Sequence, residues 1–185
     1  LSTGSPLLSD HFQYIQDAIK SDVQISSISG GTDIISCFAL GNPLVPVFDG
    51  EIQSIGLGMA VKVFNEAGQE TQKGEKGELV CTQSFPSMPI EFFNDPDREK
   101  YKQSYFKKFE NTWAHGDFAT ITENNGVIIY GRSDATLNSA GVRIGTAEIY
   151  RQTETLPQIL DAVVVETTRK SESTIILFVV LKKDE

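Results

Sequence analysis

The sequence has 185 residues, 39% of them hydrophobic, which is typical of one globular domain or two small ones. Its net charge of −9 at pH 7 excludes a nucleic-acid backbone as partner, because that binding needs a basic face. No apolar run approaches the roughly 20 residues of a membrane span, and we expect no signal segment. Cys37 and Cys81 fit reduced thiols in a cytoplasmic protein better than a disulfide or a zinc site.

The first half of the chain is predicted to contain one helix and three strands. The helix has Ser9 as its N-cap and carries Phe12, Ile15 and Ile19 on one face. Alternating or β-branched runs predict strands over residues 22–29, 57–64 and 77–82. Residues 41–50, with two prolines, read as a loop.

The second half is predicted to be a helix, a hairpin, a long crossing and an α+β unit. The helix covers 95–106, with Pro96 near its start, and the hairpin joins 118–122 to 126–131. Small and polar residues then lead to a helix that Thr146 caps. Two further strands are predicted at 161–166 and 174–182.

Two glycines followed by Thr32 and Asp33 stand directly after a predicted strand. Glycines let backbone N–H groups approach an anion, a hydroxyl can bond a phosphate oxygen, and a carboxylate can hold Mg²⁺. An ordinary Gly-Gly turn without a ligand would account for the same residues.

Asp117 follows His115 and Gly116 and precedes a strand. A carboxylate there could accept hydrogen bonds from both hydroxyls of a ribose, although a turn aspartate explains it equally well. His115 could act as a general base, but a structural or supporting role is the simpler interpretation, because no Ser, Cys or Asp stands in an obvious partner arrangement nearby.

Three charged residues lie in the crossing that follows the predicted hairpin: Arg132, Asp134 and Arg143. The first two could form an ordinary surface pair. Arg143 lies between Gly141 and Gly145, and a guanidinium on an adjustable backbone suits bidentate phosphate recognition.

The stretches GSP, GGTD, HGD, GRSD and GVRIG occur in this order and cover essentially the whole chain. In this order they resemble the adenylate-forming superfamily of acyl-CoA synthetases, luciferases and nonribosomal-peptide adenylation domains. Within it the chain is most similar to the acetoacetyl-CoA synthetase family. The resemblance implies a ligase of lipid and fatty acid metabolism that uses acetoacetate, ATP, Mg²⁺ and coenzyme A.

The resemblance also implies a role for individual residues. It places the following residues around ATP: Gly4, Ser5, Pro6, Gly30, Gly31, Thr32, Asp117, Arg132 and Arg143. It assigns Asp33 to Mg²⁺, one methylene shorter than the family's glutamate, and Asp134 to the hinge of a mobile C-terminal domain. Ser29 and Gly30 stand where acetyl-specific relatives carry bulky aromatics, so small residues there would enlarge the acyl pocket.

The implied fold is α+β, a fragment of the two-domain adenylate-forming fold. Residues 1–50 would be a remnant of the large α/β domain, 51–133 a β-rich subdomain, and 134–185 the start of the C-terminal α+β domain. The family's phosphate loop is expected before Leu1 and its catalytic lysine beyond Glu185, since Lys170 stands too early in the domain. No catalytic residue is therefore expected within the chain, and the chain alone is expected to be inactive.

Two alternatives remain open from the sequence. One is a synthetase for acetate or another short-chain acid. The other is a non-catalytic nucleotide-binding or interaction module that keeps the motifs as scaffold.

Overall fold

A computed structural model describes residues 1–139, 142–169 and 172–182, which form two compact units. The first unit is Leu1–Ile129 and the second is Tyr130–Glu185. Gly141, Lys170 and Glu185 lie outside the described residues. The assignment of residues 1–50, 51–133 and 134–185 to domains of a larger enzyme stays a prediction.

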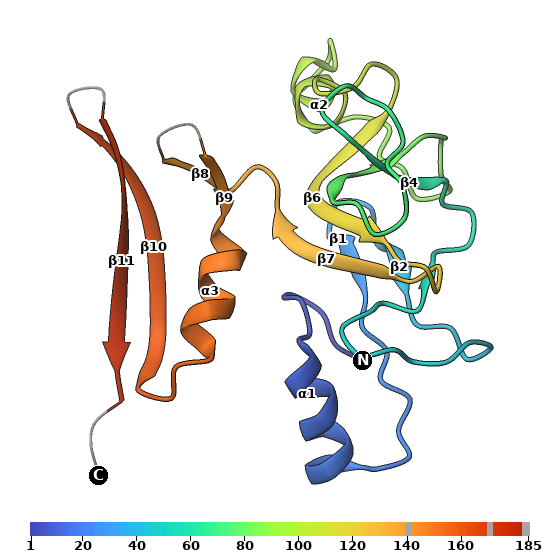
Figure 1. Cartoon of the computed structure of the whole chain (residues 1–185). Coiled ribbons are helices and arrows are strands. Elements are labelled where there is room, and N and C mark those ends of the chain that lie inside the picture. Colours follow the sequence, from blue (N-terminus) through green and yellow to red (C-terminus); the bar gives the residue numbers. More distant parts are fainter. Residues whose placement is uncertain (140–141, 170–171, 183–185) are drawn as a thin grey trace. The chain divides into compact units, whose positions relative to one another are not determined.

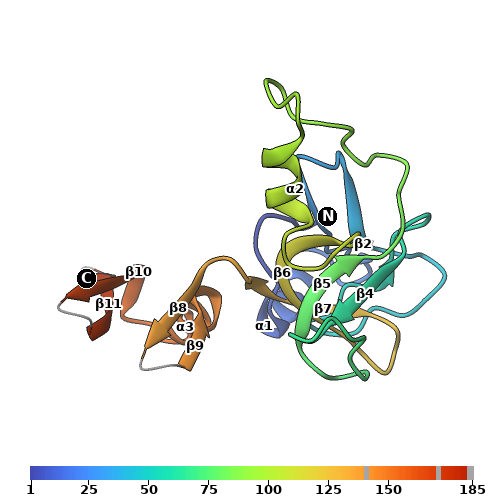
Figure 2. The same ribbon diagram turned by 90° about the horizontal axis from the view of Figure 1, so that it is seen from above.

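The first unit is built around two antiparallel sheets (Figure 1). One has the strand order β1-β2-β3, with bounds Ser29–Gly31, Ser36–Leu40 and Ser54–Ile55. The other has the order β4-β5-β6-β7, with bounds Val61–Phe64, Gly77–Cys81, Trp113–Ile121 and Val127–Arg132. Figure 2 shows β4, β5 and β7 beside one another, with the helix α2 (Glu99–Tyr105) near β6.

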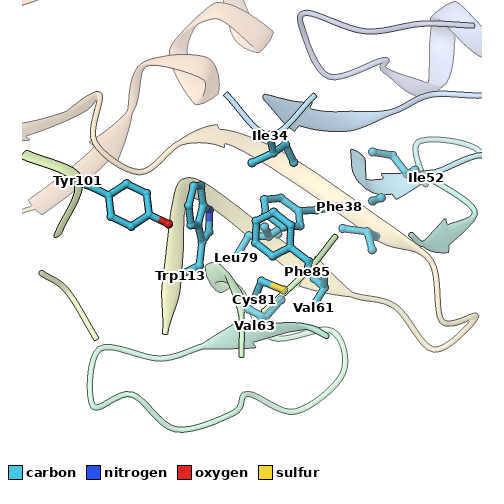
Figure 3. Close-up of a cluster of buried hydrophobic side chains, with 13 residues drawn as sticks. Ile34, Phe38, Ile52, Val61, Val63, Leu79, Cys81, Phe85, Tyr101 and Trp113 are labelled. Carbon is cyan, nitrogen blue, oxygen red and sulfur yellow. The ribbon is translucent and has the colours of Figure 1, made fainter. Parts of the chain in front are cut away.

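The core of the first unit joins the two sheets, because both contribute to one cluster of buried side chains. Phe38 of β2 and Trp113 of β6 are 0% and 1% exposed. Phe85 packs edge-on against both rings, with centroid distances of 5.3 Å and 5.4 Å (Figure 3). Edge-to-face aromatic packing adds specific geometry to the burial of large apolar area.

The N-terminal helix is present, but its cap differs from the prediction. It comprises α1 (Ser9–Tyr14) and a π-helical turn, η1 (Ile15–Ile19). Leu8, not Ser9, is the N-cap, with extended φ and ψ of −82° and 161°. The wider π turn changes the helical period after Tyr14, so Ile19, which is 69% exposed, does not share the face of the buried Phe12.

Two strand predictions change. The strand expected over 22–29 is wrong: β1 begins only at Ser29 and contains both glycines. The strand expected over 118–122 begins earlier, at Trp113, because β6 continues through the His-Gly-Asp stretch. Of the strand expected over 57–64 only Val61–Phe64 forms, because residues 57 and 58 make a turn. The strands expected over 77–82 and 126–131 and the loop over 41–50 are confirmed.

The second unit holds two antiparallel strand pairs and a helix. Strands β8 (Thr136–Ser139) and β9 (Val142–Gly145) pair with each other, so the crossing predicted as a loop is a hairpin. The helix α3 (Thr146–Glu154) starts after the N-cap Gly145, one residue before the predicted cap. Strands β10 (Ile159–Arg169) and β11 (Glu172–Leu181) confirm the last two predictions. None of the helices in the described ranges has the length and apolar character to cross a membrane.

We predict that Phe38→Ala destabilises the first unit by about 3–5 kcal/mol, because it leaves a cavity in the rigid aromatic cluster. Urea unfolding followed by tryptophan fluorescence measures this directly, since Trp113 is the only tryptophan of the chain. Phe93→Ala is the matched control, as Phe93 is 92% exposed. Equal effects of the two substitutions would contradict the packing that we describe.

Candidate functional site

The N-terminal turn lies beside the strand that carries the two glycines. Ser2 forms a parallel bridge with Ser27: its N–H donates to the carbonyl of Ser26 at 2.8 Å, and its own carbonyl accepts from Ile28 at 2.9 Å. Gly4, with a φ of +91°, follows this bridge by two residues. Ser2 therefore lies beside Ser27, two residues before the start of β1 at Ser29, although the two are distant in the sequence.

Gly30 has a structural reason to be glycine. A Cβ atom at Gly30 would lie 2.2 Å from the carbonyl oxygen of Ser36, on the neighbouring strand β2. The register of β1 and β2 also shifts between Ser29 and Gly30. Strand packing thus requires a glycine at position 30. The expectation of an enlarged acyl pocket therefore depends on Ser29 alone.

Asp33 follows β1, and both of its carboxylate oxygens are hydrogen-bonded. The hydroxyl of Tyr105 donates to Oδ2 at 2.6 Å, and the backbone N–H of Ile34 donates to Oδ1 at 3.1 Å. Tyr105 is itself held by stacking on Trp113, with ring centroids 3.6 Å apart and planes at 12°. The aromatic core therefore sets the position of an otherwise exposed carboxylate.

The His-Gly-Asp stretch forms a bulge in β6. Glu78 of β5 pairs with Phe118 and Val80 pairs with Ala114, so residues 115–117 together face Leu79 alone. Gly116 supplies the positive φ of +84° that this bulge needs, a conformation that glycine adopts without steric cost. Its N–H donates to Oε1 of Glu78 at 2.9 Å.

His115 and Asp117 are both buried, at 6% and 8% exposure. The imidazole Nε2 lies 3.7 Å from Oδ2 of Asp117, and Nδ1 accepts from the indole N–H of Trp113 at 3.5 Å. The ring also packs edge-on against Phe38, with centroids 4.8 Å apart. These contacts favour the structural role for His115, beside the carboxylate of Asp117.

Gly31 brings these two stretches together. A Cβ atom at Gly31 would lie 2.0 Å from Oδ1 of Asp33 and 3.2 Å from Cε1 of His115. The Gly-Gly-Thr-Asp turn and the His-Gly-Asp bulge thus approach each other across one glycine. The Asp33 carboxylate and the edge of the His115 ring fill the space above Gly31, so this close approach requires a glycine.

The second unit contains the two remaining motifs. Arg132 and Asp134 form a bidentate pair: Nε donates to Oδ1 at 2.9 Å, and Nη2 contacts Oδ2. Both side chains are at least half exposed, so the pair contributes little to stability. The backbone of Arg143 lies in β9 opposite Asn138, and its side chain is outside the described part of the chain.

The cysteines take no part in this chemistry. Burial raises the pKa of the Cys81 thiol and also that of Cys37, which disfavours the thiolate that a nucleophile needs. Both are free thiols. Across the described ranges, no three His, Cys, Asp or Glu side chains gather into a group that could hold a metal. A cation here would need oxygens from its substrate as well.

Sequence reasoning missed Tyr105 and Glu78, the side chains that hold Asp33 and the β6 bulge. Tyr105 lies 72 residues from Asp33 and Glu78 lies 38 residues from Gly116, so no local pattern links them. Glu78 did leave one signal, since a single charge interrupts the apolar strand GELVC.

Comparisons with known proteins found acetoacetyl-CoA synthetases that are similar to nearly the whole chain. The acetoacetyl-coenzyme A synthetase of Rhizobium meliloti is 56% identical over 182 residues, which is 98% of this chain and 28% of that protein. The acetoacetyl-CoA synthetase of Gallus gallus is 48% identical over 96% of the chain and 27% of its own length. No protein-family model matches. The chain thus spans little more than a quarter of the curated relatives that it matches.

Solved structures agree in fold. Acetoacetyl-CoA synthetase from Streptomyces lividans has a TM-score of 0.81 at 41% identity, over 96% of this chain and 27% of that one. An anthranilate CoA ligase, solved in complex with anthranoyl-AMP, has a TM-score of 0.74 at 19% identity, over 98% and 34%. The predicted α+β segment of the adenylate-forming fold is confirmed, as is the homology to acetoacetyl-CoA synthetases over nearly the whole chain.

We expect Tyr105→Phe to destabilise the first unit by about 1 kcal/mol, because it removes the hydroxyl donor to Asp33 and keeps the stack on Trp113. Tyr14→Phe is the control, since Tyr14 is 64% exposed. In urea unfolding, Asp33→Asn combined with Tyr105→Phe should cost less than the two single changes summed. Strict additivity would mean that the two side chains do not interact.

Proposed function

Because nearly the whole chain matches a segment of acetoacetyl-CoA synthetases, we propose that the protein containing it is an ATP-dependent acid–thiol ligase that joins acetoacetate to coenzyme A. The observation that carries this is 56% identity over 98% of the chain. The approach of the Gly-Gly-Thr-Asp turn to the His-Gly-Asp bulge at Gly31 supports it from the geometry.

The proposed reaction has two steps. The carboxylate of acetoacetate attacks the α-phosphorus of ATP, and pyrophosphate leaves. The thiol of coenzyme A then attacks the carbonyl of the acyl-adenylate, and AMP leaves. Proteins assist phosphoryl chemistry of this kind chiefly by positioning the reactants and by stabilising charge.

Each nucleotide-binding role is part of the proposal. Backbone N–H groups of Gly30, Gly31 and Thr32 bind the α-phosphate and the acyl carboxylate, and Gly4, Ser5 and Pro6 line the adenine. Asp117 accepts from the ribose hydroxyls. In the second unit Arg132 binds the ribose, Arg143 binds phosphate, and Asp134 is the hinge between the two catalytic orientations.

Asp33 fits Mg²⁺ as one carboxylate ligand, since Mg²⁺ in nucleotide sites is bound by one or two carboxylates together with phosphate oxygens. Bound there, Mg²⁺ would neutralise charge on the phosphates. Tyr105 keeps the carboxylate oriented, through the 2.6 Å hydrogen bond to Oδ2. We also propose that the enzyme works in the cytoplasm, which its free cysteines support.

The acyl preference is proposed to rest on Ser29. Its small side chain leaves room that an aromatic residue would fill, and its hydroxyl can meet the keto oxygen of acetoacetate. Pocket size alone discriminates weakly, because one methylene is worth only about 1–3 kcal/mol. The hydroxyl therefore adds the polar part of the selection.

For the full-length protein, we predict that acetoacetate gives the highest kcat/KM among acetoacetate, acetate, butyrate and 3-hydroxybutyrate, measured by pyrophosphate release. Ser29→Ala should lower kcat/KM for acetoacetate about fivefold more than for butyrate, which has no keto oxygen to bind. Ser21→Ala, at an exposed position, is the control. If acetate is preferred, the short-chain alternative replaces acetoacetate. If ATP binds but no acid releases pyrophosphate, the protein is a nucleotide-binding module.

Asp117→Asn in the full-length protein is expected to raise the KM for ATP by roughly 10-fold to 100-fold, because two ribose hydroxyls lose a charged acceptor. The KM for acetoacetate should stay unchanged. Asp97→Asn makes the same substitution at an exposed position of the same unit and should leave both constants unaltered. An unaltered KM for ATP in folded Asp117→Asn protein would leave Asp117 as a structural turn residue.

A further inference from the structure

Glu78 is a charged residue in a strand that is otherwise apolar and buried. It lies in β5, every residue of which is buried, and Glu78 itself is 2% exposed. Burying an apolar side chain at such a position would cost less free energy, because a buried carboxylate must be paired and hydrogen-bonded to offset its lost hydration. This free-energy cost of burial indicates that the carboxylate of Glu78 has a role that an apolar side chain could not fill.

The two oxygens of Glu78 have separate partners. Oε1 accepts the backbone N–H of Gly116 at 2.9 Å, and Oε2 lies 2.5 Å from the ammonium group of Lys108. Lys108 is half exposed and compensates the buried charge from the solvent side. The carboxylate thus ties the backbone of the bulge to a fixed cation.

The bulge that Glu78 holds contains the residue proposed to bind ribose. Residues 115–117 face Leu79 alone, so regular strand pairing does not fix the direction of Asp117. The only β5 side chain with a described hydrogen bond to the backbone of 115–117 is Glu78. A misplacement of about 1 Å at a binding group can cost roughly 100-fold in rate.

We propose that Glu78, compensated by Lys108, is a positioning residue for nucleotide recognition: it fixes the β6 bulge and thereby the direction in which Asp117 meets the ribose. This inference rests on the proposed function. It differs from a purely structural role, because it ties Glu78 to the recognition of ribose hydroxyls and not only to folding.

The test compares ATP with 2′-deoxy-ATP and 3′-deoxy-ATP in the full-length protein, using the ratio of their kcat/KM values. Wild-type protein should prefer ATP by roughly tenfold or more, the value of one charge-assisted hydrogen bond. In Glu78→Ala the preference should fall to about twofold, because Asp117 no longer holds its direction. General destabilisation lowers all three rates together and leaves the ratio unchanged.

Glu78→Gln provides the graded variant. Gly116 and Lys108 use different oxygens of Glu78, and the amide replaces one of these oxygens by an NH2 group that cannot accept. The preference of Glu78→Gln for ATP should therefore fall between those of wild type and Glu78→Ala. Glu70→Ala is the matched control. It removes a carboxylate that pairs with Lys62 at 2.8 Å on the exposed surface beside β4, and it should keep the wild-type ratio.

The outcomes separate the two proposals. No ATP-dependent activity in wild type contradicts the proposed function, and equal use of the deoxy analogues contradicts the role of Asp117. A wild-type preference that persists in folded Glu78→Ala overturns the positioning role. If Glu78→Ala does not fold, Glu78→Gln decides instead. A preference of Glu78→Gln for ATP over the deoxy analogues equal to that of wild-type protein would overturn the positioning role of Glu78.

Discussion

The bulge of β6 is the constraint on which the site of the first unit depends. Residues 115–117 occupy the space opposite one residue of β5, with Gly116 at a positive φ and its N–H held by Glu78. The bulge sets His115 beside both Asp117 and Gly31, while Trp113, two residues before His115, stays in the core. The extra residues and the turned backbone exist only in the bulge, and they direct the N–H of Gly116 to the side chain of Glu78.

In this unit the residues of the aromatic core contact the polar residues of the site directly. Trp113 packs on Phe85, stacks with Tyr105 and donates its indole N–H towards His115. Through Tyr105 the same core reaches Asp33. Rigid positioning of polar groups by packed rings suits chemistry that depends on orientation, because reorganisation at the moment of reaction is avoided.

Sequence patterns predicted most elements, and they failed where pairing partners decide the structure. The run 22–29 alternates like a strand, yet only Ser29 enters β1, because ladder pairing needs a neighbour that the pattern does not supply. The crossing after Arg132 looked like a loop from its small polar residues, and it pairs with itself as β8 and β9. Propensity is a weak predictor at such places, since tertiary contacts override it.

The sequence by itself predicted the similarity to acetoacetyl-CoA synthetases, through five short motifs in a fixed order, and it determined which residue types stand at each motif. Motifs carry this information because nucleotide chemistry needs particular groups near particular glycines. Only the tertiary structure decided how those groups are held. Tyr105 on Asp33 and Glu78 on Gly116 act across 72 and 38 residues, and Gly30 is small because Ser36 leaves it no room. Contacts of that range depend on strand pairing and on the position of α2, which no local pattern records.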